Sequence, residues 1–282
     1  MANRKIKILI ISIILICSIS SCNKADLRSM FISYESVNTR FEQSLNKNMQ
    51  TGYQTIETTN DEYQLFVMSD SHVGSTKNLN TFMQNAVNAD ATAVVMVGDL
   101  TTGKEDDYDV FAENIEKYPT MLKFPIVGNH DIFFNGWNCF YKLFGSTVYY
   151  FVVKGTDFSD IYFCLDTGSG TLGDKQLEWF TNQLETKRQL YRHCVVFTHN
   201  NLFRARHIPT TEPMTEELLV LLDLFVKYNV NIVITGHDHK KDVSFFGNTT
   251  HIILSALLDK NVDAAYLNLI VNDNINYEFL NL

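Results

Sequence analysis

The sequence contains few of the residues that mark several structural classes. Its 282 residues include only 4 prolines, 13 glycines and 5 cysteines. So little proline and glycine excludes a collagen-like or low-complexity chain, and 45% hydrophobic residues suffice for a folded core. No run of about 20 apolar residues, the length of a membrane-spanning helix, occurs either. The length suits one large domain or two small ones.

One short apolar block stands out near the N-terminus. Residues 6–19 are mostly Ile, Leu and Ser, follow Arg4 and Lys5, and end shortly before Cys22. A basic start, a short apolar stretch and small residues are typical of an export signal. Ile-Ser-Ser-Cys also resembles the bacterial lipobox, whose Cys becomes the lipid-modified first residue. We therefore expect residues 1–21 to be a lipoprotein signal peptide, with a plain signal or an uncleaved anchor as the alternative.

Lipidation at Cys22 would make the protein an exported bacterial lipoprotein, anchored in a membrane and extracytoplasmic. Loss of residues 1–21 removes three cations and changes the net charge from −9 to −12. Such an acidic chain is not expected to bind nucleic acid, because polyanions are attracted mainly by Lys and Arg.

Three cysteines remain after the signal peptide, namely Cys139, Cys164 and Cys194. Three cannot all pair within one chain, and no CxxC metal pattern is present. Cys164 and Cys194 stand in apolar runs, so we expect buried free thiols there.

Residues 22–60 are predicted to form a tether and an amphipathic helix, ahead of one domain at residues 61–282. Within that first segment, apolar residues recur at helical spacing: Phe31, Tyr34, Val37, Phe41 and Leu45. The helix is expected to pack on the domain.

Buried strands and helices alternate along the first part of the domain. Strands are predicted at 63–68, 92–97, 124–127, 161–165, 194–198 and 230–235, and helices at 79–88, 108–118, 174–191 and 215–228. This alternation indicates βαβ units with parallel pairing. Strands alone follow, at 243–246, 250–255, 264–271 and 275–280, which predicts hairpins and a second, largely antiparallel sheet region.

Metal-ligating residue types follow five of the predicted strands. They are Asp70 and His72, then Asp99, then Asn129, His130 and Asp131, then His199, and finally His237 and His239. Taken singly, each group has an ordinary explanation as a helix cap or a turn. Because parallel strands place their carboxyl ends along one edge of a sheet, all five groups should converge there.

The predicted ligand inventory is two Asp, four His and one Asn, without Cys. Oxygen and nitrogen ligands of this kind suit Mn, Fe, Zn or Ni. Seven ligands around two ions about 3.5–4 Å apart require one bridging carboxylate. Two divalent cations with two carboxylates keep a net positive charge, which favours an anionic phosphoryl substrate.

In this order, Asp-x-His, Gly-Asp, Gly-Asn-His-Asp, His and Gly-His-x-His resemble the calcineurin-like metallophosphoesterase superfamily. The resemblance covers about residues 63–239, and residues 172–180 are similar to a helix start found in many secreted or anchored members. It implies an α/β fold, a four-layer αββα sandwich of two mixed β-sheets.

The same resemblance implies the roles of individual residues. The first metal would be held by Asp70, His72, Asp99 and His239. The second would be held by Asp99, Asn129, His199 and His237, so that Asp99 bridges. A small phosphomonoester or phosphodiester would be hydrolysed by a hydroxide bridging the two divalent ions, with His130 as general acid and Asp131 orienting its ring.

Thr102 stands where the iron-tyrosinate acid phosphatases of this superfamily carry Tyr, which argues against an iron(III)–tyrosinate centre. Arg204 and Arg206 are weaker candidates for binding substrate phosphate, since solvated loop cations are the usual alternative. Asp166 also ends a strand, but its Asp-Thr-Gly sequence favours a structural turn. His193 and His251 belong to no motif.

Two further hypotheses remain open from the sequence. A catalytically silent surface-binding lipoprotein could use the same fold, because fold does not fix function. A nuclease of the same superfamily is the other, and the acidic charge and the lipid anchor argue against it. The sequence leaves open the oligomeric state, the metal identity and the preference for monoesters or diesters.

Overall fold

The computed structural model describes residues 35–73, 76–201 and 215–282. The predicted signal peptide, Cys22, Arg204 and Arg206 lie outside the described residues. Within the described ranges, no helix has both the length and the apolar character needed to cross a bilayer.

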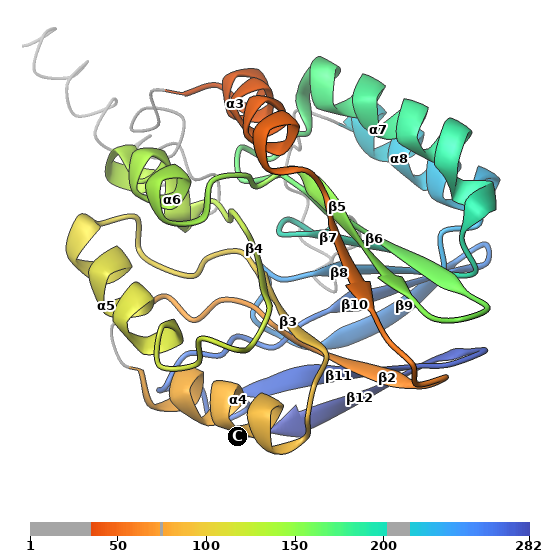
Figure 1. Cartoon of the computed structure of the whole chain (residues 1–282). Helices are drawn as coiled ribbons and strands as arrows, with labels where there is room; N and C mark the ends of the chain where they lie inside the picture. Colours follow the sequence, from red (N-terminus) through yellow and green to blue (C-terminus); the bar gives the residue numbers. More distant parts are fainter. Residues whose placement is uncertain (1–34, 74–75, 202–214) are drawn as a thin grey trace, which may run out of the picture.

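Two mixed β-sheets form the centre of the molecule (Figure 1). The five-stranded sheet has the order β12 (Ile275–Asn281), β11 (Ala265–Val271), β2 (Tyr63–Met68), β3 (Ala93–Val97) and β4 (Lys123–Ile126). The seven-stranded sheet has the order β1 (Gln54–Glu57), β5 (Tyr149–Lys154), β6 (Ser159–Leu165), β7 (Cys194–Thr198), β8 (Ile232–Thr235), β10 (Thr249–Ile253) and β9 (Asp242–Phe246).

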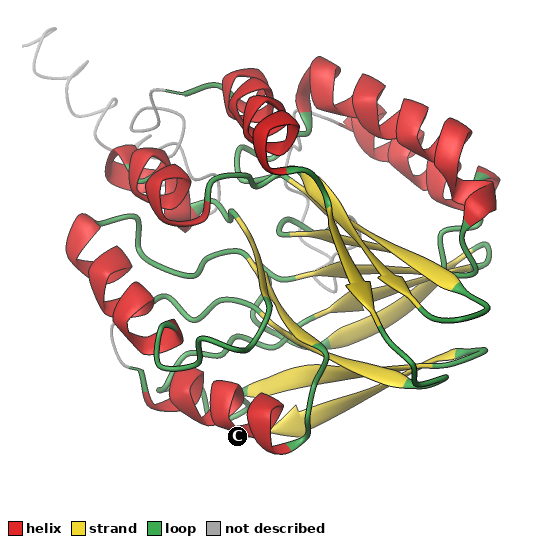
Figure 2. Ribbon diagram, in the orientation of Figure 1, coloured by secondary structure: helices red, strands yellow, loops and turns green. Residues whose placement is uncertain are grey.

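Helices cover the outer faces of both sheets (Figure 2). The five-stranded sheet packs against α4 (Lys77–Asn88), α5 (Glu105–Ile115) and α6 (Trp137–Phe144). The seven-stranded sheet packs against α7 (Gly173–Lys187) and α8 (Thr215–Lys227), and α3 (Val37–Thr51) lies beside α7. Short 3₁₀ turns, η1 (His130–Asn135) and η2 (Arg188–Leu190), complete the described elements. The arrangement is the predicted α/β sandwich.

The layers follow from the alternation of side chains along each strand. In β2, Leu65 and Val67 face the other sheet, whereas Phe66 and Met68 face the helices. In β7, Val195 and Phe197 likewise face inward, and Val196 packs under α7 and α8. Because both faces of these strands are buried, their sequences are continuously apolar. Three apolar clusters result, one between the sheets and one under each helical layer.

Every predicted strand and helix of the domain is present, with ends shifted by a few residues. Four of the described elements were not predicted: β1, β5, α6 and the short turn η1. The sequence of β1 is polar because it is an exposed edge strand, so it carries no apolar pattern. The helix α6 lies within an aromatic-rich run whose pattern does not distinguish helix from core strand.

The sequence predicted a second, largely antiparallel sheet region for the C-terminal strands. The structure has no such separate region among the described residues. The β9–β10 hairpin joins the seven-stranded sheet, where β10 pairs with β8 in parallel. The β11–β12 hairpin joins the five-stranded sheet, where β11 pairs antiparallel with β2. Each hairpin extends a different open sheet edge and adds antiparallel pairing there, and the seven-stranded sheet also contains the antiparallel pair β5 and β6.

The helix predicted in residues 22–60 is α3, and Val37 and Phe41 are buried in it as expected. Polar side chains of α3 are buried as well, namely Arg40, Ser44 and Asn48. The segment ahead of residue 61 also contributes β1, which pairs in parallel with β5. Cys164 and Cys194 are buried free thiols, as predicted.

Candidate metal centre

The predicted ligand residues all follow the carboxyl ends of strands, and the two sheets contribute together. Asp70 and Asp99 come from the five-stranded sheet, after β2 and β3. His199, His237 and His239 come from the seven-stranded sheet, after β7 and β8. A parallel bridge between Ser69 and Ala256 joins the two regions next to Asp70. The centre therefore lies where the two sheets meet.

Many of these residues have an unusual backbone conformation. The φ angles are 55° at Asp70, 38° at His72, 51° at Asp99, 69° at His237 and 61° at His239. Left-handed conformations of non-glycine residues cost about 1–3 kcal/mol each and cluster at functional sites. The turns they make let residues two apart, such as 70 and 72, direct their side chains to one point.

Two glycines allow the loops to approach one another. A Cβ on Gly98, whose φ is 75°, would collide with the His199 ring. A Cβ on Gly128 would collide with the backbone nitrogen and carboxylate of Asp99. Glycine at both positions thus permits close contact among the Asp99, Asn129 and His199 loops.

Among the residues that the structure describes, three groups of side chains have ligand atoms within 4.8 Å of one another, so that each could hold a metal ion. They are Asp70, His72 and His239; His72, Asp99 and His130; and Asp99, His199 and His237. His72 and Asp99 each occur in two groups, so the groups form one continuous centre.

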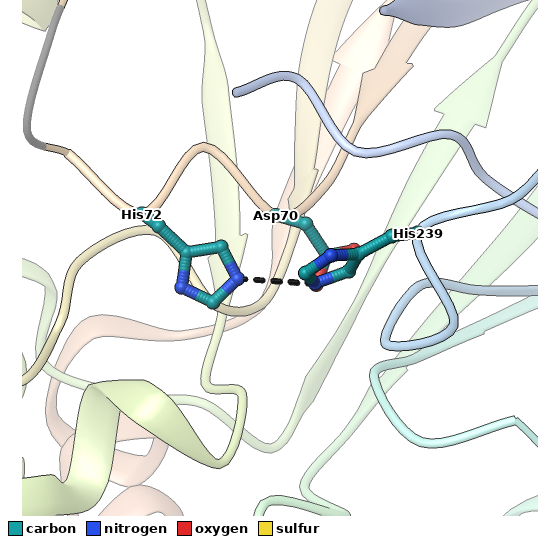
Figure 3. Close-up of side chains that lie close together, drawn as sticks. All are labelled: Asp70, His72 and His239. Carbon is teal, nitrogen blue, oxygen red and sulfur yellow. Dashed lines mark hydrogen bonds and ion pairs between the residues drawn. The ribbon is translucent and has the colours of Figure 1, made fainter. Parts of the chain in front are cut away.

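The rings of His72 and His239 point at each other beside the Asp70 carboxylate (Figure 3). Their Nε2 atoms are 3.2 Å apart, and His239 Nε2 is 3.2 Å from Asp70 Oδ1. His72 Nε2 lies 3.7 Å from Asp70 Oδ1 and 3.6 Å from Asp99 Oδ2. Two imidazole nitrogens and two carboxylates thus face one small volume.

The second half of the centre is built around Asp99. Its Oδ2 lies 3.2 Å from His199 Nε2. His199 Nδ1 donates to the Val97 carbonyl oxygen at 2.9 Å, which fixes the ring and directs Nε2 toward the carboxylates. Nearby, Asn129 Oδ1 and His237 Nδ1 are 2.9 Å apart. The structure therefore brings together all seven residues predicted as ligands.

The donor atoms fit a bound cation. Asp70 Oδ1 and His199 Nε2 are buried, and among the described residues neither makes a well-aligned hydrogen bond, although His239 Nε2 lies 3.2 Å from the first and Asp99 Oδ2 3.2 Å from the second. Buried polar atoms are normally hydrogen-bonded, so an unsatisfied carboxylate oxygen beside an unsatisfied imidazole nitrogen indicates a missing partner. Mixed oxygen and nitrogen donors suit a divalent transition metal.

The carboxylates and histidines of the centre shift one another's pKa values. Burial raises the pKa of the Asp99 carboxyl, but His199 and His72 outweigh it and lower the pKa to about 2. Burial lowers the pKa of His199, whereas Asp99 and Asp70 raise it, and the net pKa is about 10. His237, dehydrated and near His199, has its pKa lowered to about 4. The two buried carboxylates thus favour positive charge at their centre.

His130 borders the centre without being enclosed by it. Its Nε2 lies 4.0 Å from Asp99 Oδ2, and its side chain is 38% exposed, against 10% for His72. The ring packs edge-on against His72, with centroids 4.4 Å apart. An imidazole in this position is accessible to a molecule that enters from solvent.

Asp131 has partners other than the His130 ring to which we had assigned it. Its buried carboxylate accepts hydrogen bonds from the backbone nitrogens of Gly128, Leu100 and Thr101 and from the Thr101 hydroxyl. Burial and the nearby Asp99 raise its pKa to about 6. Asp131 thus ties the Asp99 loop to the Asn129 loop, a contact that sequence spacing does not reveal.

Two other contacts were missed by sequence reasoning. The Ser69 hydroxyl donates to Asp70 Oδ2, which leaves Oδ1 of that carboxylate facing the centre. Asp166, expected to be structural, forms a buried ion pair with Arg40 of α3. Ser69 directly precedes the Asp-x-His motif, which is a local signal for it, but no local signal connects Arg40 with Asp166.

A family model described as calcineurin-like phosphoesterase matches residues 63–241, and no curated protein matches the sequence. Solved structures share the fold at low identity. Plasmodium GAP50, described as the anchor in the inner membrane complex, is 14% identical, with a TM-score of 0.64 over 78% of this chain and 84% of that one. A dimetal phosphatase from Danio rerio is 13% identical, with a TM-score of 0.58 over 77% and 95%. A putative 5'-nucleotidase from Staphylococcus aureus is 16% identical, with a TM-score of 0.54 over 78% and 53%.

Proposed function

The chain belongs to the calcineurin-like phosphoesterase family, and we propose that it hydrolyses a small phosphomonoester or phosphodiester with the help of two divalent metal ions. One observation carries the proposal: Asp70 Oδ1 and His199 Nε2 are buried at the point where the ligand residues converge, and among the described residues neither makes a well-aligned hydrogen bond, although His239 Nε2 and Asp99 Oδ2 lie 3.2 Å from them. A binding protein that needed only the fold would have no reason to keep these atoms unsatisfied.

In this proposal Asp70, His72 and His239 hold the first ion, and Asn129, His199 and His237 hold the second. Asp99 takes part in both, since its carboxylate lies within 3.6 Å of His72 Nε2 and 3.2 Å of His199 Nε2. When bound, the ions would supply an activated water near neutral pH and would polarise the phosphoryl oxygens. The donor set suits Mn, Fe, Zn or Ni.

We assign His130 the role of general acid. Its ring is accessible to solvent and lies at the edge of the centre, 4.0 Å from Asp99 Oδ2. From there the imidazolium can protonate the oxygen of the departing alcohol as its bond to phosphorus breaks. The backbone nitrogen of His130 donates to Asp99 Oδ1 at 2.7 Å, which couples the position of the acid to that of the shared carboxylate.

The test combines metal analysis with a substrate panel. The full chain is loaded with Mn²⁺, its metal content is measured by plasma emission, and hydrolysis is followed for p-nitrophenyl phosphate, bis-p-nitrophenyl phosphate, cyclic nucleotides and single-stranded DNA. We expect about two ions per chain and turnover of a small ester. Failure to bind metal, or turnover of none of the four, would overturn the proposal, and a preference for DNA would favour a nuclease.

A catalytically silent binding protein is the second candidate. The fold is shared with GAP50, a protein described as an anchor, so the fold itself is compatible with such a role. Against it stands the complete set of seven ligand-type residues, because a silent site has no need to retain them. Two bound ions without turnover of any ester would favour this candidate.

We further propose that the protein is exported and lipid-anchored through Cys22, as the N-terminal sequence predicts. The proposal is tested in a bacterial host by feeding an alkyne-labelled fatty acid and separating membranes from soluble protein. The wild-type chain should be labelled and sediment with membranes, whereas Cys22→Ser should be unlabelled. Labelling of both chains, or of neither, would contradict lipidation at Cys22.

A further inference from the structure

The first described helix, α3, is fixed to the domain by a buried ion pair. The guanidinium of Arg40 donates to both oxygens of Asp166, through Nε at 2.7 Å and Nη2 at 3.1 Å. Both side chains are fully buried. Arg40 Nη1 donates to the Glu35 carbonyl and Nη2 to the Ser169 hydroxyl, so all three guanidinium nitrogens are used. A buried charge that loses its partner destabilises the folded protein strongly, so Arg40 and Asp166 must stay paired.

Asp166 begins the loop of residues 166–169, which follows β6 and lies next to the metal centre. The Thr167 hydroxyl is 2.8 Å from the Thr198 hydroxyl and accepts a hydrogen bond from Asn200 N at 2.8 Å. Thr198 and Asn200 are the two neighbours of His199. The loop thus holds His199 from both sides in the sequence.

The same loop supports the neighbour of Asn129. A Cβ added to Gly168 would lie 2.9 Å from the Gly128 carbonyl oxygen, which shows how closely the two backbones pack. Asp166 Oδ1 accepts from Gly168 N at 2.9 Å, so the carboxylate paired with Arg40 also shapes this contact. One loop therefore abuts both the His199 and the Asn129 segments.

The ligands proposed for the first metal are held by other contacts. Asp70 N donates to Gly98 O at 3.0 Å, and His72 N donates to Asp99 O at 3.0 Å. Ala256 N donates to His239 O at 3.3 Å. These hydrogen bonds join strand ends to one another and do not involve the loop of residues 166–169.

We propose that Arg40 is a positioning residue for the second metal: through Asp166 it holds His199 and Asn129 where they bind that ion. This inference rests on the proposed two-metal centre and deepens it. It says that binding of the second ion depends on α3, whereas binding of the first does not. Loss of the Arg40 guanidinium leaves the Asp166 carboxylate buried and unpaired, so the loop must rearrange. The second metal should then bind more weakly, and the first should be little affected.

The chain offers a matched control at the other end of the sheets. Arg192 Nη2 donates to the buried Asp160 carboxylate at 2.7 Å and Nε donates at 3.1 Å, the same fork-shaped pairing. Asp160 lies near the start of β6, whereas Asp166 follows its end. Arg192→Met therefore breaks a comparable ion pair far from the metal centre, and it separates general destabilisation from a specific effect.

The experiment is calorimetric titration of the metal-free full chain with Mn²⁺, at a temperature where circular dichroism shows each protein folded. The wild type should bind two ions. Arg40→Met should bind one ion as tightly as the wild type does and the other at least about 10-fold less tightly, the usual size of an effect through the partners of a ligand. Arg192→Met should bind both ions as the wild type does. Arg40→Lys, which keeps the charge and loses the fork, should fall between wild type and Arg40→Met.

Unchanged affinity for the second ion in Arg40→Met would overturn the inference, and so would an equal loss in Arg192→Met. If Arg40→Met does not fold, Arg40→Lys decides, and wild-type affinity in that variant would overturn it. A wild-type chain that binds fewer than two ions would overturn the inference together with the metal centre. Two ions without turnover of any ester would contradict only the enzymatic proposal and would leave the role of Arg40 standing.

Discussion

Two carboxylates buried at opposite ends of the β-sandwich, those of Asp160 and Asp70, have opposite surroundings. At the amino ends of the strands, Asp160 accepts hydrogen bonds from the Tyr63 hydroxyl at 2.7 Å, from Arg192 and from His193 N at 3.0 Å. At the carboxyl ends, Asp70 keeps an oxygen without a hydrogen-bond partner. The first arrangement is complete in the protein alone, whereas the second fits a bound cation.

The backbone shows the same contrast. At the amino ends, Asp90 and Asn229 have positive φ angles of 52° and 49°, but each follows a helix, where Asp and Asn commonly end it in this conformation. At the carboxyl ends, five of the seven proposed ligand residues have positive φ angles, and Phe134 and Asn135 of η1 have them as well. At the amino ends, the left-handed conformation reverses the chain after a helix. At the carboxyl ends, it places side chains at the candidate metal centre.

Among the variants considered, Asp99→Asn should have the largest effect on kcat/KM. The shared carboxylate contributes to both proposed ions, so its neutralisation should lower kcat/KM by at least about 1,000-fold, since metal assistance supplies several kcal/mol. Asp160→Asn makes the same chemical change at the opposite end and should reduce stability while preserving kcat/KM. Steady-state kinetics and thermal unfolding of both variants check the pair. Similar kinetic losses in the two would remove the distinction between the ends.

His130→Ala tests which part of the carboxyl end acts on the substrate. Loss of a general acid should lower kcat by about 100-fold or more. Metal content should stay at the wild-type value, because His130 lies outside the proposed ligand set. His193→Ala is the control, since His193 is buried at the amino end, with Nε2 2.9 Å from the Asn272 carbonyl. The assignment fails if His130→Ala loses metal and activity together, or keeps full activity.

The carboxyl end shows both what the sequence reveals and what it hides. That the seven candidate ligands converge was predictable, because each depends on a local rule: an apolar strand, a turn, then a polar residue at a strand end. The partners of Asp131 were not, since the carboxylate turns away from its neighbour to reach the backbone of residues 100 and 101.

Long-range pairing was equally hidden. Arg40 and Asp166 are 126 residues apart, and the polar residues of α3 had the pattern of a solvent-exposed face. The two C-terminal hairpins joined different sheets because each found a different open edge, which is a property of the assembled strands. The candidate ligand residues can be recognised from short stretches of sequence, whereas the contacts that hold them in place depend on the whole fold.

Arg192→Met tests how much the buried ion pair at the amino end contributes to stability. It leaves Asp160 buried with a negative charge and fewer donors, so the free energy of unfolding should fall by about 2 kcal/mol, somewhat less than for a fully buried pair because Arg192 is 21% exposed. Turnover at a temperature where the variant is folded should equal that of the wild type. Urea unfolding and kinetics on the same preparation provide both values. A loss of kcat larger than the loss of folded protein would show that the ends are coupled.

The smallest expected effect concerns a histidine that belongs to neither end. His251 lies in β10 and is buried, like His199, but dehydration lowers its pKa to about 4, whereas the carboxylates around His199 raise the pKa of that ring to about 10. The ordinary value is 6.5, so between pH 6.5 and 4 the unfolded chain binds a proton at His251 that the folded chain does not. Its contribution to stability is therefore complete above pH 6.5 and is lost as the pH falls toward 4.

His251→Gln removes this titration without adding charge. The difference in the free energy of unfolding between wild type and variant should be constant above pH 6.5 and should shift in favour of the variant at pH 5. Urea unfolding of both metal-free chains at pH 7.5 and pH 5 measures it, and taking the difference cancels the titration of the metal-centre histidines, which both chains share. Parallel pH profiles would show that burial at β10 does not exclude the proton. A shift would confirm that burial without a neighbouring carboxylate keeps His251 uncharged, in contrast to His199.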